Sequence, residues 1–211
     1  MMAYNSRSRL SRKEDSLELV PLQKKVSVVV CSCSHSNNVE GLIQLIRQHM
    51  NDVVETVRYE FLPYNIRDMN KFDLSGIDVL LLCHSIENRR FSITNVTDAL
   101  YDGFLPRARK HLGQSKVGVI AHDFPEGDIS SEKLSSKMDS FRHTQSTTFE
   151  SASLVLIGGK LINDEVQLND EQLEELQEFF SNASSPPAQE VLKVWLHKAF
   201  HFFTCNLLVN V

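Results

Sequence analysis

The chain has 211 residues, of which 42% are apolar and 23% charged, a composition typical of a folded domain rather than of a disordered chain. The length is sufficient for one sizeable domain with tails. The formal net charge of −5 argues against a general nucleic-acid-binding protein, which would carry a basic surface.

The two ends of the chain differ in composition from its middle. Residues 1–24 are polar and of mixed charge, have no apolar run of the signal-peptide kind, and predict a disordered or loosely attached arm. We expect the domain to span residues 25–182. Residues 183–187, "ASSPP", predict a linker, and residues 188–211 form a strongly apolar C-terminal extension.

Four cysteines, Cys31, Cys33, Cys83 and Cys205, lie in largely apolar segments. The first two form a C-x-C pair, which is neither the C-x-x-C of a redox pair nor a zinc-binding spacing. They are typical of buried free thiols, with no metal site implied. Together with the missing signal peptide, they predict a cytoplasmic, intracellular protein.

Five apolar segments have the character of strands. They are "VSVVVCS" (26–32), "ETVRYEFLPY" (55–64), "DVLLLCHS" (78–85), "KVGVIAHDF" (116–124) and "ASLVLIGG" (152–159). The third is apolar almost throughout and predicts a central strand, whereas the second alternates and predicts a position near an edge.

Helical patterns separate these strands. The first helix follows Asn38, a candidate N-cap, and the second covers residues 94–112 with a kink or restart that places Pro106 in a first turn. Residues 130–150 predict a weak helix, and Asn169 or Asp170 caps the last one. The alternation predicts a three-layer, doubly wound α/β domain around a mainly parallel five-stranded sheet.

Ligands bind such folds beyond the carboxyl ends of the strands. The loops expected there are residues 32–38, 84–90, 122–128 and 158–164. The first contains hydroxyl and amide side chains at Ser34, Ser36, Asn37 and Asn38, just before a helix N-terminus that would favour an anion. The loop has neither glycine nor lysine, which argues against a working P-loop NTPase.

The segment "SHSNNVEGLIQLI" (34–46) is similar to the phosphate loop of flavodoxins, which has the form S-x-T-G-N-T-E. The segments "DLSGIDVLLLCHS" (73–85) and "GFLPRARKHLGQSKVGVIAHD" (103–123) resemble the flavodoxin strands and helix that follow, so the resemblance covers residues 25–182. It implies a flavodoxin-like fold and, as an alternative to no cofactor, bound flavin mononucleotide (FMN). The residues that would contact FMN are Ser34, Ser36, Asn37, Asn38, Ser85 and Phe124.

The chain departs from the flavodoxin pattern at the positions that hold the flavin. Asn37 stands in place of the loop glycine, Val39 in place of a threonine, and Ile86 near the position of a flavin-stacking aromatic residue. An additional stretch, "ENRRFSITN" (87–95), lies where the flavin ring would be. These departures indicate a decayed cofactor loop.

A second resemblance competes with the first. The segment "LLCHSIENRRFSITNVTDALYDGFLPRARKHL" (81–112) is similar to the Ras and Rho stretch after the third strand, and "VLIGGKLINDE" (155–165) is similar to the guanine loop. The P-loop lysine and the N-K-x-D motif are both missing. This resemblance therefore implies a pseudo-GTPase that cannot hold magnesium and GTP.

Two features suggest a protein partner. The apolar extension 188–211 is interrupted by lysines and histidines, which argues against a transmembrane helix, so it either packs on its own domain or binds a partner. A basic stripe is expected from Arg89, Arg90, Arg107, Arg109 and Lys110, either as a solvated face or as a contact for an acidic partner.

Candidate catalytic groups are few. His122 and Asp123 adjoin at a strand end, where successive side chains should point apart, and we interpret them as a turn with local hydrogen bonds. His84 and Ser85 lack a G-x-S-x-G motif, so a hydrolase is a distant alternative. We therefore expect a non-catalytic protein-interaction module, with an FMN-binding redox protein as the alternative.

Overall fold

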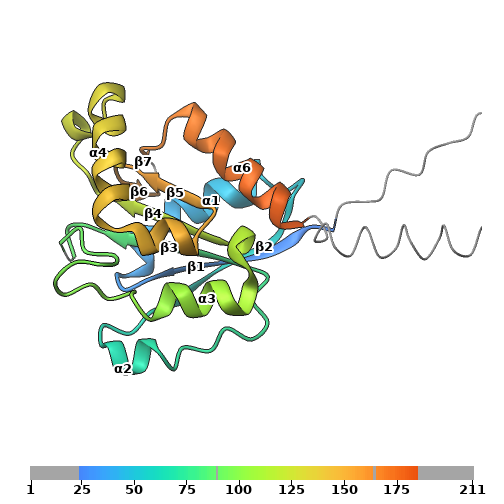
Figure 1. Ribbon diagram of the computed structural model, residues 1–211. Helices are drawn as coiled ribbons and strands as arrows, with labels where there is room; N and C mark the ends of the chain where they lie inside the picture. The colour runs from blue at the N-terminus through green and yellow to red at the C-terminus, as the bar shows by residue number, and fades with distance from the viewer. Residues whose placement is uncertain (1–23, 89, 164, 185–211) are drawn as a thin grey trace, which may run out of the picture.

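The computed structural model describes residues 24–88, 90–163 and 165–184 (Figure 1). Its centre is a five-stranded, all-parallel sheet in the order β2-β1-β3-β4-β5. The strands are β1 (Val26–Ser32), β2 (Val54–Phe61), β3 (Val79–Ser85), β4 (Val117–His122) and β5 (Leu154–Ile157). This order is that of flavodoxin-like doubly wound folds, and it confirms the predicted fold class.

Burial follows the position of each strand in the sheet. Every residue of β3 and β4 is buried, because helices cover both faces of these strands. β2 alternates between buried and exposed residues and lies at one edge. Both predictions, a central third strand and a second strand near the edge, are confirmed.

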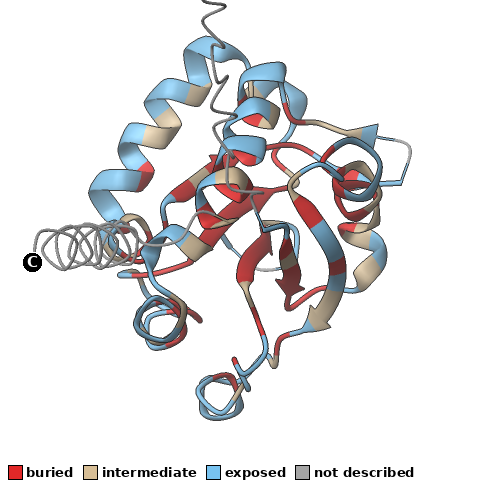
Figure 2. Ribbon diagram, turned by 90° about the vertical axis from the view of Figure 1, so that its right-hand side faces the viewer, coloured by how far each residue is buried: buried red, intermediate tan, exposed pale blue. Residues whose placement is uncertain are grey.

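Helices cover the sheet in two layers. α1 (Glu40–His49) and α6 (Asp170–Ser184) share one apolar cluster with the sheet. The other face packs against α2 (Ile66–Met69), α3 (Phe104–Leu112), α4 (Ser131–Thr144) and α5 (Ser146–Ser151). Figure 1 shows α3 on the opposite side of the sheet from α1 and α6, and Figure 2 shows buried residues concentrated on the strands between the layers.

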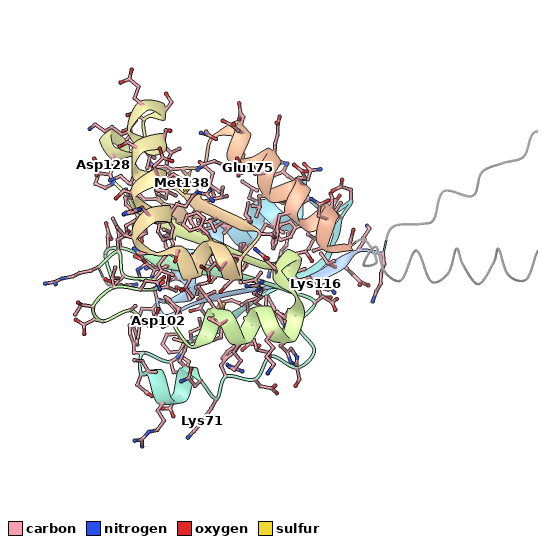
Figure 3. All side chains as sticks on the ribbon, viewed as in Figure 1. Lys71, Asp102, Lys116, Asp128, Met138 and Glu175 are labelled. Carbon is pink, nitrogen blue, oxygen red and sulfur yellow. The ribbon has the colours of Figure 1, made fainter. Side chains whose placement is uncertain are left out.

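Charged side chains cover the outside of these layers (Figure 3). Asp128 lies near two lysines of α4, with its carboxylate 3.5 Å from Nζ of Lys137 and 3.9 Å from Nζ of Lys133. Such exposed pairs contribute about 0–1 kcal/mol each to stability. The fold therefore depends on its two apolar clusters far more than on its surface ion pairs.

Helix starts differ in part from the sequence predictions. α1 begins at Glu40 with Val39 as its N-cap, whereas Asn38 belongs to a 3-10 turn, η1 (Ser36–Asn38), and does not cap the helix. Asn169 does cap α6: its Oδ1 accepts the Gln172 N–H at 2.8 Å, while Oε1 of Gln172 accepts the Asn169 N–H at 3.1 Å. This reciprocal pair is a capping box.

The structure also differs from the prediction in residues 94–112, expected as one long helix, and in residues 130–150, expected as a weak helix. Residues 94–103 form a loop, and α3 starts at Phe104 with Pro106 in its first turn, where the missing N–H is harmless. The polar stretch after β4 contains two helices, α4 and α5, rather than one weak helix. Short 3-10 turns, η2 (Gln114–Lys116) and η3 (Glu126–Asp128), connect the elements around β4.

A small antiparallel hairpin after β5 was not predicted from the sequence. β6 (Leu161–Ile162) pairs with β7 (Glu165–Val166), and the hairpin contacts both η1 and α1. Its two-residue strands are too short to leave a periodic signal. The hairpin lies against the beginning of α1, and this position matters for the candidate site.

The predicted arm and C-terminal extension lie outside the described residues, apart from residue 24 of the arm. α6 continues through Ser184, so residues 183 and 184 of the expected linker are helical. α6 ends near the amino end of β1, at the sheet edge opposite the carboxyl ends of the strands (Figure 1). Among the described helices, none combines the length and apolar character needed to cross a membrane.

Candidate functional site

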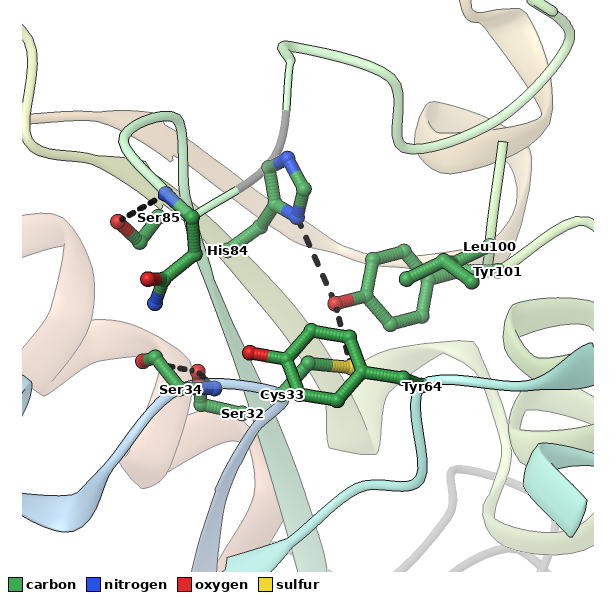
Figure 4. A pocket seen from close by; sticks show the side chains of 9 residues that line it. Ser32, Cys33, Ser34, Tyr64, His84, Ser85, Leu100 and Tyr101 are labelled. Carbon is green, nitrogen blue, oxygen red and sulfur yellow. Dashed lines mark hydrogen bonds between the residues drawn. The ribbon is translucent and has the colours of Figure 1, made fainter. Parts of the chain in front are cut away.

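The candidate site lies between the carboxyl ends of β1 and β3. The chain leaves β1 toward β2 on one side and continues through β3, β4 and β5 on the other, so the strand order reverses here. Ligands of doubly wound folds bind at this switch point. A small cavity occupies it (Figure 4), lined by Ser32, Cys33, Ser34, Tyr64, His84, Ser85, Asn88, Leu100 and Tyr101.

The cavity is small because side chains from two loops fill it. Tyr64 comes from the loop after β2, while Leu100 and Tyr101 come from the loop before α3. The free space inside the cavity is about 10 Å³, roughly the space that one water molecule needs. The described side chains thus leave no room at the switch point for a flavin.

A second depression adjoins this cavity and shares Asn88 with it. Its empty volume is about 750 Å³ including open solvent, and its lining is polar apart from Ile86. The lining residues are Ile86, Glu87, Asn88, Arg90, Ser92 and Asp98. Since no aromatic ring is among these residues, the depression lacks the apolar lining on which a flavin ring would stack.

Ser34, the first residue of the predicted phosphate loop, is buried and bonded within the protein. Its Oγ lies 2.8 Å from Oγ of Ser32, which also accepts the Ser34 N–H at 3.1 Å. The Tyr59 hydroxyl donates to the Ser34 carbonyl. A phosphate bound through the Ser34 hydroxyl would have to replace the contact with Ser32.

The remaining loop candidates, Ser36, Asn37 and Asn38, form η1 and are partly or fully exposed. The N-terminus of α1 follows, where backbone N–H groups would favour an anion. The β6–β7 hairpin packs against this position, with the Ile162 carbonyl against Gly41 in the first turn of α1. A backbone carbonyl therefore lies beside the helix N-terminus.

Ser85 and the pair His122–Asp123 are brought together at the ends of β3 and β4. The Ser85 hydroxyl donates to Oδ2 of Asp123, and Nδ1 of His122 lies 3.1 Å from the same oxygen. The prediction that His122 and Asp123 point apart is wrong, because Asp123 has a φ of 68° and turns its side chain back. The predicted turn with local hydrogen bonds is present.

These contacts set the ionisation of Asp123. Burial opposes its charge, but His122, the Ser85 hydroxyl and Lys160 outweigh burial and hold the pKa of Asp123 below its ordinary value. The carboxylate lies between the serine and the histidine. It therefore stabilises the turn and does not orient His122 as a base toward Ser85.

We expect Asp123→Asn to flatten the acid dependence of stability. The unfolded chain protonates Asp123 first, at about pH 3.9, so its stabilising effect is present above that pH and is lost as pH falls toward the lower folded value. Asparagine tolerates φ of 68° and keeps an acceptor for Ser85. Chemical denaturation over a pH series measures the slope of the free energy of unfolding against pH.

Asp98→Asn is the matched control, because Asp98 is exposed and also has a left-handed backbone, with φ of 64°. We expect this variant to keep the wild-type slope. An Asp123→Asn variant with the same acid slope as wild type would contradict the proposed effect of Asp123.

Phe124, the proposed flavin-stacking residue, lies in the core and not at the cavity. Its ring packs edge-on against Phe91 with centroids 5.2 Å apart, and Nζ of Lys137 lies 5.1 Å from its centroid. Only 5% of Phe124 is exposed. A flavin could reach this ring only if Phe91 or Lys137 moved away.

The residues of the expected basic stripe are not all brought together. Arg90 is on the loop after β3 at the carboxyl edge, whereas Arg109 and Lys110 are in the last turn of α3, where the chain returns toward the amino end of β4. Arg107 is half-buried, donates to the Met69 carbonyl at 3.1 Å and packs on an aromatic ring. Arg89 lies outside the described residues.

Sequence reasoning missed the part of the cavity lining that lies outside loops 32–38 and 84–90. Tyr64, Leu100 and Tyr101 belong to no motif, and they come from loops whose paths depend on tertiary contacts. Cys33 was considered with Cys31, and His84 with Ser85, since nothing in the sequence joins Cys33 to His84. The structure connects both through Tyr101.

Comparisons with known proteins give a likeness of structure and none of sequence. The chain matches no protein-family model and no curated protein. Among solved structures it is similar to a short-chain flavodoxin associated with a bacterial microcompartment, at 14% identity and a TM-score of 0.35. The match covers 75% of this chain and 96% of that one. The flavodoxin-like assignment rests on the strand order above, and the Ras/Rho resemblance remains a prediction.

Proposed function

We propose that this protein is a non-catalytic protein-interaction module on a flavodoxin-like scaffold. The observation that carries the proposal is the filled switch point, where Tyr64, Leu100 and Tyr101 occupy much of the space in which such folds hold a ligand. The bonded state of Ser34 and the burial of Phe124 support the same conclusion. A scaffold with a closed ligand crevice can still present its loops to a partner.

The candidate contact surface lies beside the cavity. Three large apolar side chains are exposed here: Phe61 at the end of β2, Tyr64 in the following loop, and Ile66 in α2. Their exposed fractions are 51%, 48% and 55%, respectively. The rings of Phe61 and Tyr64 meet edge-on with centroids 6.1 Å apart. Exposed aromatic side chains that gather on one surface are typical of protein contact sites.

The first test of this proposal is cofactor binding. We expect the purified full chain to show no visible absorbance and no change in thermal midpoint on addition of FMN, GTP or GDP. A yellow protein, or a midpoint raised by several degrees with FMN, would overturn the proposal in favour of the FMN-binding alternative, because a ligand that binds only the folded state stabilises it. If FMN does bind, Ser34→Ala should weaken its binding, which tests whether Ser34 contacts the phosphate.

The second test is partner capture with matched variants. The double variant Phe61→Ser/Ile66→Ser removes two exposed apolar side chains, so it should lose a protein that the wild-type chain retains from cell extract. Ile162→Ser is the control, because Ile162 is also exposed, at 39%, but lies on the hairpin. Equal retention by all three proteins would exclude the Phe61–Ile66 surface as the contact.

A further inference from the structure

β2 lies at one edge of the sheet and is the longest of its five strands. It spans eight residues, Val54–Phe61, whereas β5 at the other edge spans four, Leu154–Ile157. Within the described part of the chain, β2 pairs with β1 alone. Proteins usually keep a free edge strand short or interrupt it with proline, because an open edge pairs with other strands. β2 contains no proline, so it is a long edge that is open to pairing.

The bonds between β1 and β2 show which backbone groups of β2 point away from the sheet. The Leu62 N–H donates to the Ser32 carbonyl at 2.8 Å. The pairing of the two strands is regular over residues 56–61 of β2, and its one irregularity lies before this stretch. The backbone groups of successive residues point to opposite sides of a strand. The even-numbered residues of this stretch therefore face β1, and the odd-numbered ones face outward.

Val57, Tyr59 and Phe61 thus direct N–H and carbonyl groups toward the open edge. Among the described residues, the one partner of these groups is Arg47 of α1, whose Nη2 donates to the Val57 carbonyl at 3.1 Å. Because this carbonyl bonds to a side chain and not to β1, the contact confirms its outward direction. A carbonyl oxygen has two lone pairs, so it can also accept the N–H of a further strand.

A second copy of β2 fits this edge in one register better than in the others. Two copies related by a two-fold axis pair antiparallel, with the same residue at the centre of both strands. With Arg58 or Glu60 at the centre, two like charges lie directly opposite each other, which is destabilising. With Val57 at the centre, neither side chain meets an opposite charge. With Tyr59 at the centre, Arg58 of each copy lies opposite Glu60 of the other, and both pairs are attractive.

We propose that two copies of this chain join at β2, antiparallel and centred on Tyr59, so that their sheets form one continuous sheet. The two Tyr59 residues then exchange both backbone hydrogen bonds, as do Val57 of each copy and Phe61 of the other. Arg58 and Glu60 occupy the more closely spaced pairs, in which side chains contact most directly. Nη1 of Arg58 already contacts Oε1 of Glu60 within one copy. The joint therefore brings four alternating charges together.

This inference goes beyond the proposed function and does not depend on it. The joint uses the backbone edge of β2, and the partner is the chain itself. Phe61 belongs both to the joint and to the Phe61–Ile66 surface, so the variants below change Arg58 and Glu60 instead. Loss of the dimer in these variants leaves the proposed contact surface unchanged, and the two proposals can fail separately.

The first experiment measures the dimer dissociation constant of the full chain by analytical ultracentrifugation. Arg58→Glu makes both cross-strand pairs repulsive, so it should raise the dissociation constant at least about tenfold. The exchange Arg58→Glu/Glu60→Arg restores the opposite charges and should return it to within about threefold of wild type. An exchange variant as weak as Arg58→Glu would overturn the register.

Lys71→Glu is the matched control for this experiment. Lys71 is exposed just after α2, lies 3.9 Å from the Asp68 carboxylate, and gives the same change in net charge when replaced by glutamate. We expect this variant to keep the wild-type dissociation constant. A dimer weakened as much as in Arg58→Glu would show that net charge decides association, and would overturn the proposed pairs.

The second experiment tests the register by cross-linking in full-length Cys205→Ser protein. Arg58→Cys and Glu60→Cys proteins are mixed and oxidised, and the mixed dimer keeps one of its two charge pairs. Opposite residues in such a pair have Cα atoms about 4.5 Å apart, which suits a disulfide. Arg58→Cys alone should not cross-link, because the two cysteines would be diagonal neighbours about 7–8 Å apart. Cross-linking of Arg58→Cys alone, or none in the mixture, would overturn the register.

The third experiment distinguishes a second copy from another segment of the same chain. Residues 1–23 and 185–211 lie outside the described residues, and either could pair with this edge. In a dimer, dilution below the dissociation constant should speed hydrogen exchange at the Tyr59 amide. The Leu62 amide, which donates within the chain, is the control and should not respond. Protection of Tyr59 that is independent of dilution, or a protein that stays monomeric at about 0.1 mM, would overturn the proposal.

Discussion

Replacing Gly41 with alanine should lower the free energy of unfolding by about 3 kcal/mol, at the upper end of overpacking costs. A Cβ atom at this position would lie 2.0 Å from the carbonyl oxygen of Ile162 and 2.5 Å from its carbonyl carbon. Both are backbone atoms of the hairpin, in which Ile162 pairs with Glu165 and Leu161 with Val166. The clash can be relieved only if α1 and the hairpin move apart.

Helix propensity alone would predict the opposite, that Gly41→Ala raises the free energy of unfolding. Gly41 is in the first turn of α1, and alanine in a helix is about 1 kcal/mol more favourable than glycine. Gly127 in η3 is the matched control, because a Cβ atom there would meet nothing within 4 Å. Chemical denaturation should show Gly127→Ala within about 0.5 kcal/mol of wild type. A Gly41→Ala protein as stable as wild type would mean that the hairpin does not fix the start of α1.

The second large effect is expected at Gln145, between α4 and α5. Its Oε1 accepts the N–H groups of Ile93 and Thr94 at 2.7 and 3.0 Å, and its Nε2 donates to the Phe91 carbonyl at 3.0 Å. Gln145, Ile93 and Thr94 are all buried. This one side chain thus satisfies three backbone groups of the loop that leads to Leu100 in the cavity wall.

Gln145→Leu should therefore cost about 3 kcal/mol of stability, because each buried backbone group left without a partner costs about 1–3 kcal/mol. The amides of Ile93 and Thr94 should also exchange their hydrogens faster. Gln114→Leu is the control: Gln114 is exposed and donates to two carbonyls, each at 3.3 Å. Unchanged exchange at Ile93 and Thr94 in Gln145→Leu would show that the loop does not depend on this side chain.

The placement of the site could be predicted because it follows from the alternation of strands and helices. Parallel strands joined by crossovers bring loops 32–38 and 84–90 to one edge, and the cavity is there. What the loops do at that edge could not be predicted. Asp123 turns toward His122 through a left-handed backbone, and Phe124 is held in the core by Phe91 and not exposed to a ligand.

The sequence by itself determined the five strands, the edge position of β2, a cap of α6 at Asn169 or Asp170 and the place of Pro106 in a first helical turn. These features depend on local pattern: apolar runs, alternation, a capping side chain and a fixed φ. Only the tertiary structure decided the hairpin against Gly41, the Gln145 hydrogen bonds to the 91–94 loop and the contacts of Tyr101 with Cys33 and His84. Each joins residues far apart in the chain, and such contacts are set by how the packed layers fit together, which no local pattern records.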